Sequence, residues 1–169
     1  MSADQTIFLV TQRDLRDDEP DADALYKIGV VAKIRQVLRL PGDNVRVLVE
    51  GLYRAKMQEI TGVDPYYTAN VRECVTRRIA EDISVQALLR KCRDSFENYS
   101  TLAPKISPDI LLGVSAADNI DHLSDYIASN ILLPPEEKQQ LLETLDPEKR
   151  IEKLIVILER DTFNRAGNP

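Results

Sequence analysis

The sequence predicts an α+β fold in which a β-rich lobe, residues 1–78, is followed by an α-helical lobe, residues 79–169. Two patterns predict it. In the first half of the chain, apolar residues alternate with polar ones, which is the period of a strand with one buried face. From about residue 80, apolar residues recur every three or four positions, which is the period of an amphipathic helix. Since strands and helices are segregated, a doubly wound parallel sheet is not expected.

The β-rich lobe is predicted to contain four strands. A short apolar run at residues 7–11 indicates a buried strand, and residues 66–75 indicate the last one. Between them, residues 30–40 and 45–56 flank the segment Pro41-Gly42-Asp43-Asn44, in which each residue favours a tight turn. The two middle strands are therefore expected to form a hairpin.

Alternation also predicts which side chains of this hairpin share a face. One face is expected to be buried and to carry the apolar side chains Val30, Ala32, Ile34, Leu38 and Leu40. The other is expected to be basic, with Glu50 among six cationic side chains: Lys33, Arg35, Arg39, Arg46, Arg54 and Lys56. This basic face is either a solvated strand surface or a binding surface for acidic protein segments or polyanions.

Five helices are predicted in the second half of the chain. The first carries one apolar stripe over residues 85–99. Ser107-Pro108 is typical of a helix start, because serine caps and proline fits the first helical position, and this helix is expected to stop near Gly113.

Three further helix starts follow. Asp118 is expected to cap the third helix. Pro134-Pro135 and Asp146-Pro147, each followed by acidic residues, indicate the fourth and fifth starts, because acidic groups are favoured in a first helical turn. The tail after Asp161 is polar and is expected to fray.

Composition argues against several classes of protein. With 43% hydrophobic residues, the chain is too apolar to be disordered. The longest uninterrupted apolar run, Leu154 to Leu158, is far shorter than the ~20 residues of a membrane-spanning helix, and no secretory signal opens the chain. The excess of acidic residues behind the net charge of −6 lies in residues 81–169, which argues against a broad nucleic-acid footprint.

Motifs for catalysis are missing from the sequence. None of the six glycines precedes a lysine, so there is no P-loop, and no Gly-x-Ser-x-Gly motif is present. Cys74, Cys92 and His122 are too few for a disulfide framework or a zinc site, and they are interpreted as structural residues of a protein from the cytoplasm. No catalytic, cofactor-binding or metal-binding residue is predicted, and the chain is not expected to be an enzyme on its own.

Three segments at the predicted hairpin carry a resemblance to a known family. They are Gly29-Val30-Val31-Ala32-Lys33-Ile34, Leu40-Pro41-Gly42 and Val45-Arg46-Val47-Leu48-Val49-Glu50-Gly51-Leu52-Tyr53-Arg54-Ala55. Together they resemble the amino-terminal, substrate-binding domain of Lon protease (endopeptidase La). The resemblance covers about residues 7–160, and it is looser in the helical half.

The resemblance implies a PUA-like β lobe joined to a helical bundle. It implies a domain that recruits unfolded or degron-bearing protein substrates for quality control and that helps to assemble a homohexamer. ATPase and serine–lysine protease modules would follow in the full-length protein, so ATP and Mg²⁺ are expected only there. The family-motif residues are expected to be structural: Glu50, Gly51, Leu52, Arg54 and Ala55.

Two other functions stay open at this point. The chain is also similar to stand-alone Lon-domain adaptors of the cereblon type. PUA-like domains often bind RNA, so a nucleic-acid-binding module is the alternative from another class, although the acidic sequence makes nucleic acid an unexpected partner. No membrane partner is expected.

The chain differs from the family at both ends. Family members usually carry further strands and a helix before the segment that begins at Ile7, and a long helix continues after the position of Asp161. The chain is therefore expected to be a fragment whose β lobe is incomplete at its amino terminus. An uncovered sheet edge with exposed apolar side chains is expected, which would favour self-association through the β lobe.

Four apolar side chains fall outside the buried face that alternation predicts for the hairpin: Val31, Val37, Leu48 and Tyr53. With the neighbouring Arg35 and Arg39, they are predicted to form an exposed surface that binds unfolded protein substrates. In the other interpretation, the helical lobe covers them.

Overall fold

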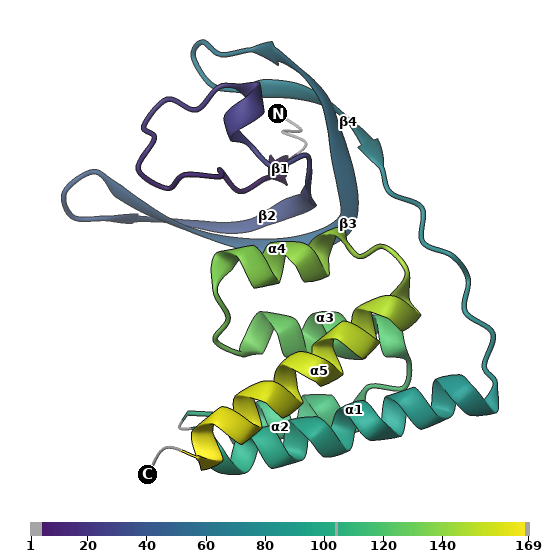
Figure 1. Cartoon of the computed structure of the whole chain (residues 1–169). Coiled ribbons are helices and arrows are strands. Elements are labelled where there is room, and N and C mark those ends of the chain that lie inside the picture. The colour runs from purple at the N-terminus through teal and green to yellow at the C-terminus, as the bar shows by residue number, and fades with distance from the viewer. Residues whose placement is uncertain (1–4, 104, 168–169) are drawn as a thin grey trace. The chain divides into compact units, whose positions relative to one another are not determined.

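The computed structural model describes residues 5–103 and 105–167 of the chain. It divides into two compact units, Met1–Val75 and Thr76–Pro169, which are called the β unit and the helical unit below. Strands occupy the first and five helices the second (Figure 1), so the predicted α+β class is confirmed. The domain boundary between residues 78 and 79 stays a prediction, and the opening residues 1–4 lie outside the described residues.

The β unit is a four-stranded antiparallel sheet with the strand order β1-β2-β3-β4. Its elements are β1 (Thr6–Leu9), a short 3-10 helix (Ala22–Ala24), β2 (Ile28–Leu40), β3 (Asn44–Gly62) and β4 (Thr68–Glu73). All four predicted strands are present, and the two central ones are longer than predicted. Because β1 pairs with β2 and β4 pairs with β3, both edge strands depend on the central hairpin.

A tight turn joins the two central strands. Gly42 and Asp43 have φ angles of 80° and 58°, and the flanking residues Leu40 and Asn44 form the last pair of the hairpin. Three residues, Pro41, Gly42 and Asp43, thus form the loop, and the last two of them have positive φ angles. Glycine adopts this conformation without strain and aspartate tolerates it. The predicted hairpin is confirmed.

A β-bulge at Arg35 interrupts the pairing of β2 with β3. Ile34 lies opposite Val49 and Gln36 lies opposite Leu48, so Arg35 is an extra residue without a partner directly across. The extra residue shifts the alternation of β2 by one position relative to β3. Side chains of β2 beyond Arg35 therefore lie on the face opposite to the one that uninterrupted alternation predicts.

The core of the β unit is small and comes from the two central strands. Four apolar side chains of the central strands are buried, namely Val31, Ala32, Ala55 and Met57, and Pro20 before the 3-10 helix is buried as well. A glycine lets β1 approach β2 closely. A Cβ atom on Gly29 would lie 2.9 Å from the ring of Phe8 and would collide with the carbonyl oxygen of Leu9.

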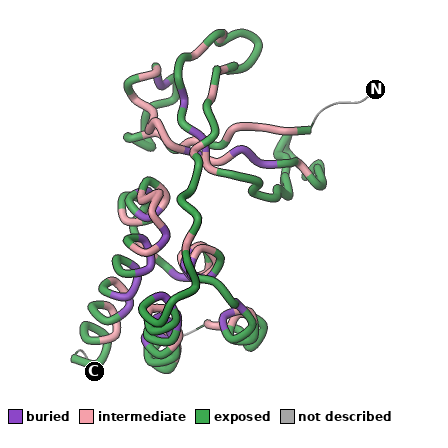
Figure 2. The backbone as a smooth tube through the Cα atoms, turned by 90° about the vertical axis from the view of Figure 1, so that its right-hand side faces the viewer, coloured by how far each residue is buried: buried purple, intermediate pink, exposed green. Residues whose placement is uncertain are grey.

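The helical unit contains α1 (Ile83–Leu102), α2 (Pro108–Ala116), α3 (Ile120–Asn130), α4 (Pro135–Glu143) and α5 (Pro147–Ala166). Their buried side chains form one continuous apolar core: Val85, Leu89, Cys92, Phe96, Tyr99, Val114, Ala117, Ile120, Leu123, Ile127, Ile131, Leu141, Ile151, Leu154, Ile155 and Leu158. Figure 2 shows buried residues recurring between exposed ones along α5, the helix that leads to the C-terminus, as the helical period predicts.

Three predicted helix ends in this unit are wrong. α2 continues through Gly113 to Ala116. Gly113 leaves room for the ring of Tyr126, which a Cβ atom at this position would overlap. The side chain of Asn119, rather than Asp118, caps α3 by accepting a hydrogen bond from the backbone of the first turn. α5 continues beyond Asp161 to Ala166.

Buried Arg150 joins three helices of the unit. Its side chain is 1% exposed, and Nη1 lies 2.6 Å from Oδ1 of Asp121 and 3.6 Å from Oδ1 of Asp125, both in α3. Nε donates to the carbonyl oxygen of Thr144 at 2.9 Å, and Nη2 donates to that of Leu145 at 3.3 Å, just after α4. One side chain of α5 therefore neutralises carboxylates of α3 and satisfies free carbonyls beyond the end of α4.

Replacing this arginine is expected to destabilise the helical unit. Arg150→Met keeps the apolar stem but leaves two carbonyl oxygens and two carboxylates without their donor, so the free energy of unfolding should fall by about 2–4 kcal/mol. Urea denaturation followed by circular dichroism at 222 nm measures this change. Arg90→Met, at an exposed position of α1, is the matched control. Equal stability of the two variants would contradict the role given to Arg150.

The contact between Gly29 and β1 gives a second prediction. Gly29→Ala should force β1 away from β2 and lower the stability of the β unit by about 1–3 kcal/mol, because the added methyl group has no room. Amide hydrogen exchange of residues 6–9 and 30–33 measures the loosening. Gly51→Ala is the matched control, since its Cβ atom would meet only Cγ1 of Val30 at 3.4 Å. Exchange that is unchanged by Gly29→Ala would show that the close approach does not hold β1.

Candidate functional site

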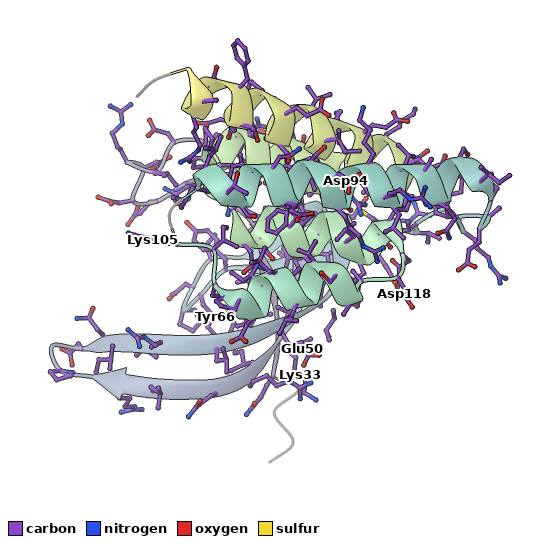
Figure 3. All side chains as sticks on the ribbon, turned by 90° about the horizontal axis from the view of Figure 1, so that it is seen from below. Lys33, Glu50, Tyr66, Asp94, Lys105 and Asp118 are labelled. Carbon is purple, nitrogen blue, oxygen red and sulfur yellow. The ribbon has the colours of Figure 1, made fainter. Side chains whose placement is uncertain are left out.

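The far half of the central hairpin has no neighbouring strand. β1 pairs with β2 only up to Lys33, and β4 pairs with β3 only from Ala55 onward. Residues 34–49, called the ribbon below, therefore pair only with each other along both strands, apart from one hydrogen bond from the backbone N–H of Ile34 to the carbonyl oxygen of Gln5. Figure 3 labels Lys33 and Glu50, the residue pair at its base, and shows the two strands extending from there to the turn. A lone two-stranded ribbon is only marginally stable in water, so it benefits from a partner.

Pairing across the ribbon defines its two faces, because residues directly opposite each other share a face. The valine face holds Val37, Val45, Val47 and Val49, and Arg39 lies on the same side opposite Val45. The leucine face holds Leu38, Leu40 and Leu48, and Arg46 lies on that side opposite Leu38.

Both faces of the ribbon are exposed. The four valines of the valine face are 37–55% exposed, and the three leucines of the leucine face are 40–59% exposed. Contiguous exposed apolar side chains on a soluble protein mark interaction sites more often than isolated ones do. The ribbon is therefore the candidate functional site of the β unit.

The prediction of one basic face is wrong. Because of the bulge at Arg35, Arg39 lies on the valine face and Arg46 on the leucine face. Arg35 itself is bound to the carboxylate of Glu50. Arg39 and Arg46 have no side-chain hydrogen bond or ion pair within the residues that the structure describes, so each face presents one uncompensated positive charge.

The predicted substrate-binding residues do not form one surface. Val31 was expected to be exposed but is 6% exposed; it lies in a central strand, between Phe8 in β1 and Tyr53 in β3. Val37 is exposed on the valine face and Leu48 on the leucine face, with exposed fractions of 54% and 59%. Tyr53 is exposed beyond the ribbon, at the base of the hairpin.

Three exposed valines of this site were missed by the sequence prediction, namely Val45, Val47 and Val49. They alternate with Arg46 and Glu50, and no exposed surface was expected from them. The run Val47-Leu48-Val49 breaks strict alternation, so it places apolar side chains on both faces of the strand.

Family-motif residues occupy the base of the hairpin. Glu50 binds Arg35, and Gly51 lies opposite Ala32. Leu52 is a second bulged residue and is 47% exposed. Arg54 is half-buried, and Ala55 is fully buried. Their structural role stays a prediction.

The remaining reactive side chains have structural surroundings. Cys92 is fully buried in the helical core, and burial raises the pKa of its thiol to about 12, so the thiolate is scarce at neutral pH. The ring of His122 lies 5.9 Å from that of Tyr126 on the same helix.

Asp82 caps α1, and hydrogen bonds from Ser84 and the backbone of Val85 lower the pKa of its carboxyl group. Within residues 5–103 and 105–167, no group of three or more histidine, cysteine or acidic side chains could hold a metal ion.

A cavity of about 380 Å³ lies within the helical unit, between residues 76–81 and the first turns of α1 and α3. Val85, Leu89 and Ile120 provide apolar walls. Its charged lining includes both Arg78 and Asp118, so the charges do not favour a ligand of either sign. None of the helices described is long and apolar enough to cross a membrane.

Comparison with known proteins identifies relatives over nearly the whole chain. Residues 1–160 match the family model of the ATP-dependent protease La (LON) substrate-binding domain. Lon protease of Heliobacterium modesticaldum is 40% identical over 161 residues, which is 95% of this chain and 20% of that protein. Lon protease of Clostridioides difficile is 35% identical over 162 residues, or 94% of this chain and 21% of that protein. The chain thus spans about a fifth of these relatives.

Solved structures share the fold. The N-terminal domain of Mycobacterium avium complex Lon protease matches with a TM-score of 0.68 at 23% identity, over 91% of this chain and 77% of that one. The Lon N-terminal domain protein from Xanthomonas campestris matches with a TM-score of 0.54 at 15% identity, over 90% of this chain and 89% of that one.

Proposed function

The chain belongs to the family of ATP-dependent protease La (Lon) substrate-binding domains, and from this premise we propose that it recruits protein substrates for an ATP-dependent serine protease. Proteolysis and ATP hydrolysis are assigned to other parts of the full-length protein, together with the binding of ATP and Mg²⁺. In this proposal the 169 residues bind the substrate but do not cleave it. The resemblance to full-length proteins further suggests a homo-oligomer that acts in protein quality control in the cytoplasm.

The exposed ribbon is the observation that supports substrate binding at a particular place. Unfolded proteins expose apolar segments that folded proteins bury, so an exposed apolar surface can distinguish them. The ribbon offers such a surface on each face: Val37 lies directly opposite Val47 on the valine face, and Leu48 lies diagonally across from Leu38 on the leucine face. We assign substrate contact to Val37, Leu48 and the other members of the two faces, and we place Tyr53 at the margin.

Unpaired arginines add a preference for acidic segments. Arg39 beside the valine face and Arg46 beside the leucine face would attract carboxylates that flank an apolar segment of the substrate. Arg35 contributes less, because Glu50 already compensates its charge. The ribbon lacks the aromatic side chains that stack on nucleic-acid bases, so acidic protein segments fit it better than RNA.

Substrate affinity is expected to be weak. A recruiting domain must release its substrate to the unfolding motor, so a dissociation constant in the micromolar range or above is suitable, which corresponds to a binding free energy of about −8 kcal/mol or weaker. A few exposed aliphatic side chains supply free energies of this size when they are buried against a partner.

Polar substitutions on the valine face test the assignment. The variant Val45→Thr/Val47→Thr keeps β-branched side chains that suit a strand, and it should weaken binding of a labelled, reduced and carboxymethylated protein about tenfold. Fluorescence anisotropy titration measures the dissociation constant. The corresponding variant of the leucine face, Leu38→Ser/Leu48→Ser, shows whether the second face contributes.

Val156→Thr is the matched control, because this valine is 65% exposed but lies on α5 in the helical unit. It should leave the dissociation constant unchanged. If both ribbon variants bind the unfolded protein as the unchanged chain does, while their circular dichroism remains that of a folded protein, the ribbon is not the binding surface.

A further inference from the structure

The segment between the last strand and the first helix has no regular secondary structure. Residues 76–82, called the linker below, follow β4 and lead into α1 (Figure 1). Thr76 is the first residue of the compact helical unit, so the linker belongs to that unit by its contacts. Val75, directly before it, is 86% exposed.

Arg77 fastens the beginning of the linker to α5. Its Nη2 atom lies 2.7 Å from Oε2 of Glu148 and 3.3 Å from Oδ1 of Asp146. Asp146 is also the capping residue of α5 and accepts a hydrogen bond from the backbone N–H of Glu148. The guanidinium group thus binds two carboxylates that the start of α5 holds in place.

Ile79 provides a second attachment, two residues later. Its side chain is partly buried and packs against the core cluster of the helical unit. It also lines the cavity of about 380 Å³, together with Val85 of α1 and Ile120 of α3. The end of the linker is fixed by Asp82, whose side chain caps α1.

We propose that the linker is a releasable strap: Arg77 and Ile79 hold it on the helical unit, and its release lengthens the flexible connection between the two units. While the strap is closed, the flexible connection is confined to Val75 and Thr76. When it opens, the five residues 77–81, between Thr76 and the capping residue Asp82, become available as well. A fully extended chain spans about 3.3–3.6 Å per residue, so release adds up to about 18 Å of reach.

The strap can open because its ionic contact is partly solvated. The side chain of Arg77 is 54% exposed, and those of Asp146 and Glu148 are 30% and 32% exposed. Ion pairs with this degree of exposure contribute little free energy and are weakened by salt. The other attachment, Ile79, is a single side chain at the margin of the core.

Reach matters for a domain that is tethered to a larger assembly. The length of a tether sets the effective concentration at which the tethered part meets its target. A closed strap limits the volume that the β unit can search, and an open strap enlarges it. This consequence does not depend on which ligand the β unit binds.

Backbone ¹⁵N relaxation on the full 169-residue chain tests the proposal. In the unchanged protein, the amides of residues 77–81 should be ordered, with order parameters near the ~0.85 of rigid backbone. In Arg77→Ala, the order parameters of residue 77 and of Arg78 should fall below about 0.6. Sodium chloride at about 1 M should cause a fall in the same direction without any substitution.

Arg78→Ala is the matched control, because this neighbouring arginine is exposed and makes no ion pair within the described part of the chain. It should leave the order parameters unchanged. Disorder of residues 77–81 in the unchanged protein, or full order in both Arg77→Ala and high salt, would overturn the proposal. No substrate is used, so the result is independent of the proposed function.

Discussion

The bulge at Arg35 is the constraint on which the surface of the β unit depends. One extra residue in β2 decides that Val37 shares a face with Val45, Val47 and Val49, and it separates Arg39 from Arg46. The bulged residue is held by its ion pair with Glu50. Both edge strands pair with the hairpin that contains this bulge, and the buried residues Val31, Ala32, Ala55 and Met57 also lie on it. The same hairpin therefore organises the sheet and carries the exposed faces.

The two units differ in how much apolar surface they bury. The helical unit buries a continuous apolar core and joins α3, α4 and α5 through the buried Arg150, so its elements support one another. The β unit buries few apolar side chains and leaves the ribbon exposed on both faces. The apolar surface that the β unit leaves exposed fits the proposed substrate-binding role.

Element type and order could be predicted from the sequence, because they depend on local periodicity. The change of period near residue 80, the turn at Gly42 and the start of α5 at Pro147 are all local signals. The bulge could not be predicted, because Arg35 and Gln36 are both polar and the alternation beyond them can be continued in either phase. Exposure of the ribbon could not be predicted either, since alternation shows which side chains share a face but not which face is covered. The burial of Val31 likewise depends on what packs over its face of the sheet, which alternation along one strand does not show.

Hydrogen–deuterium exchange of the whole chain, with and without a saturating unfolded protein, tests the central claim most directly. Bound substrate is predicted to slow exchange in residues 36–48 and to leave α1 to α5 unchanged. Slower exchange confined to the helical unit, with the ribbon exchanging as in the free protein, would contradict the assignment of the ribbon as the substrate-binding surface.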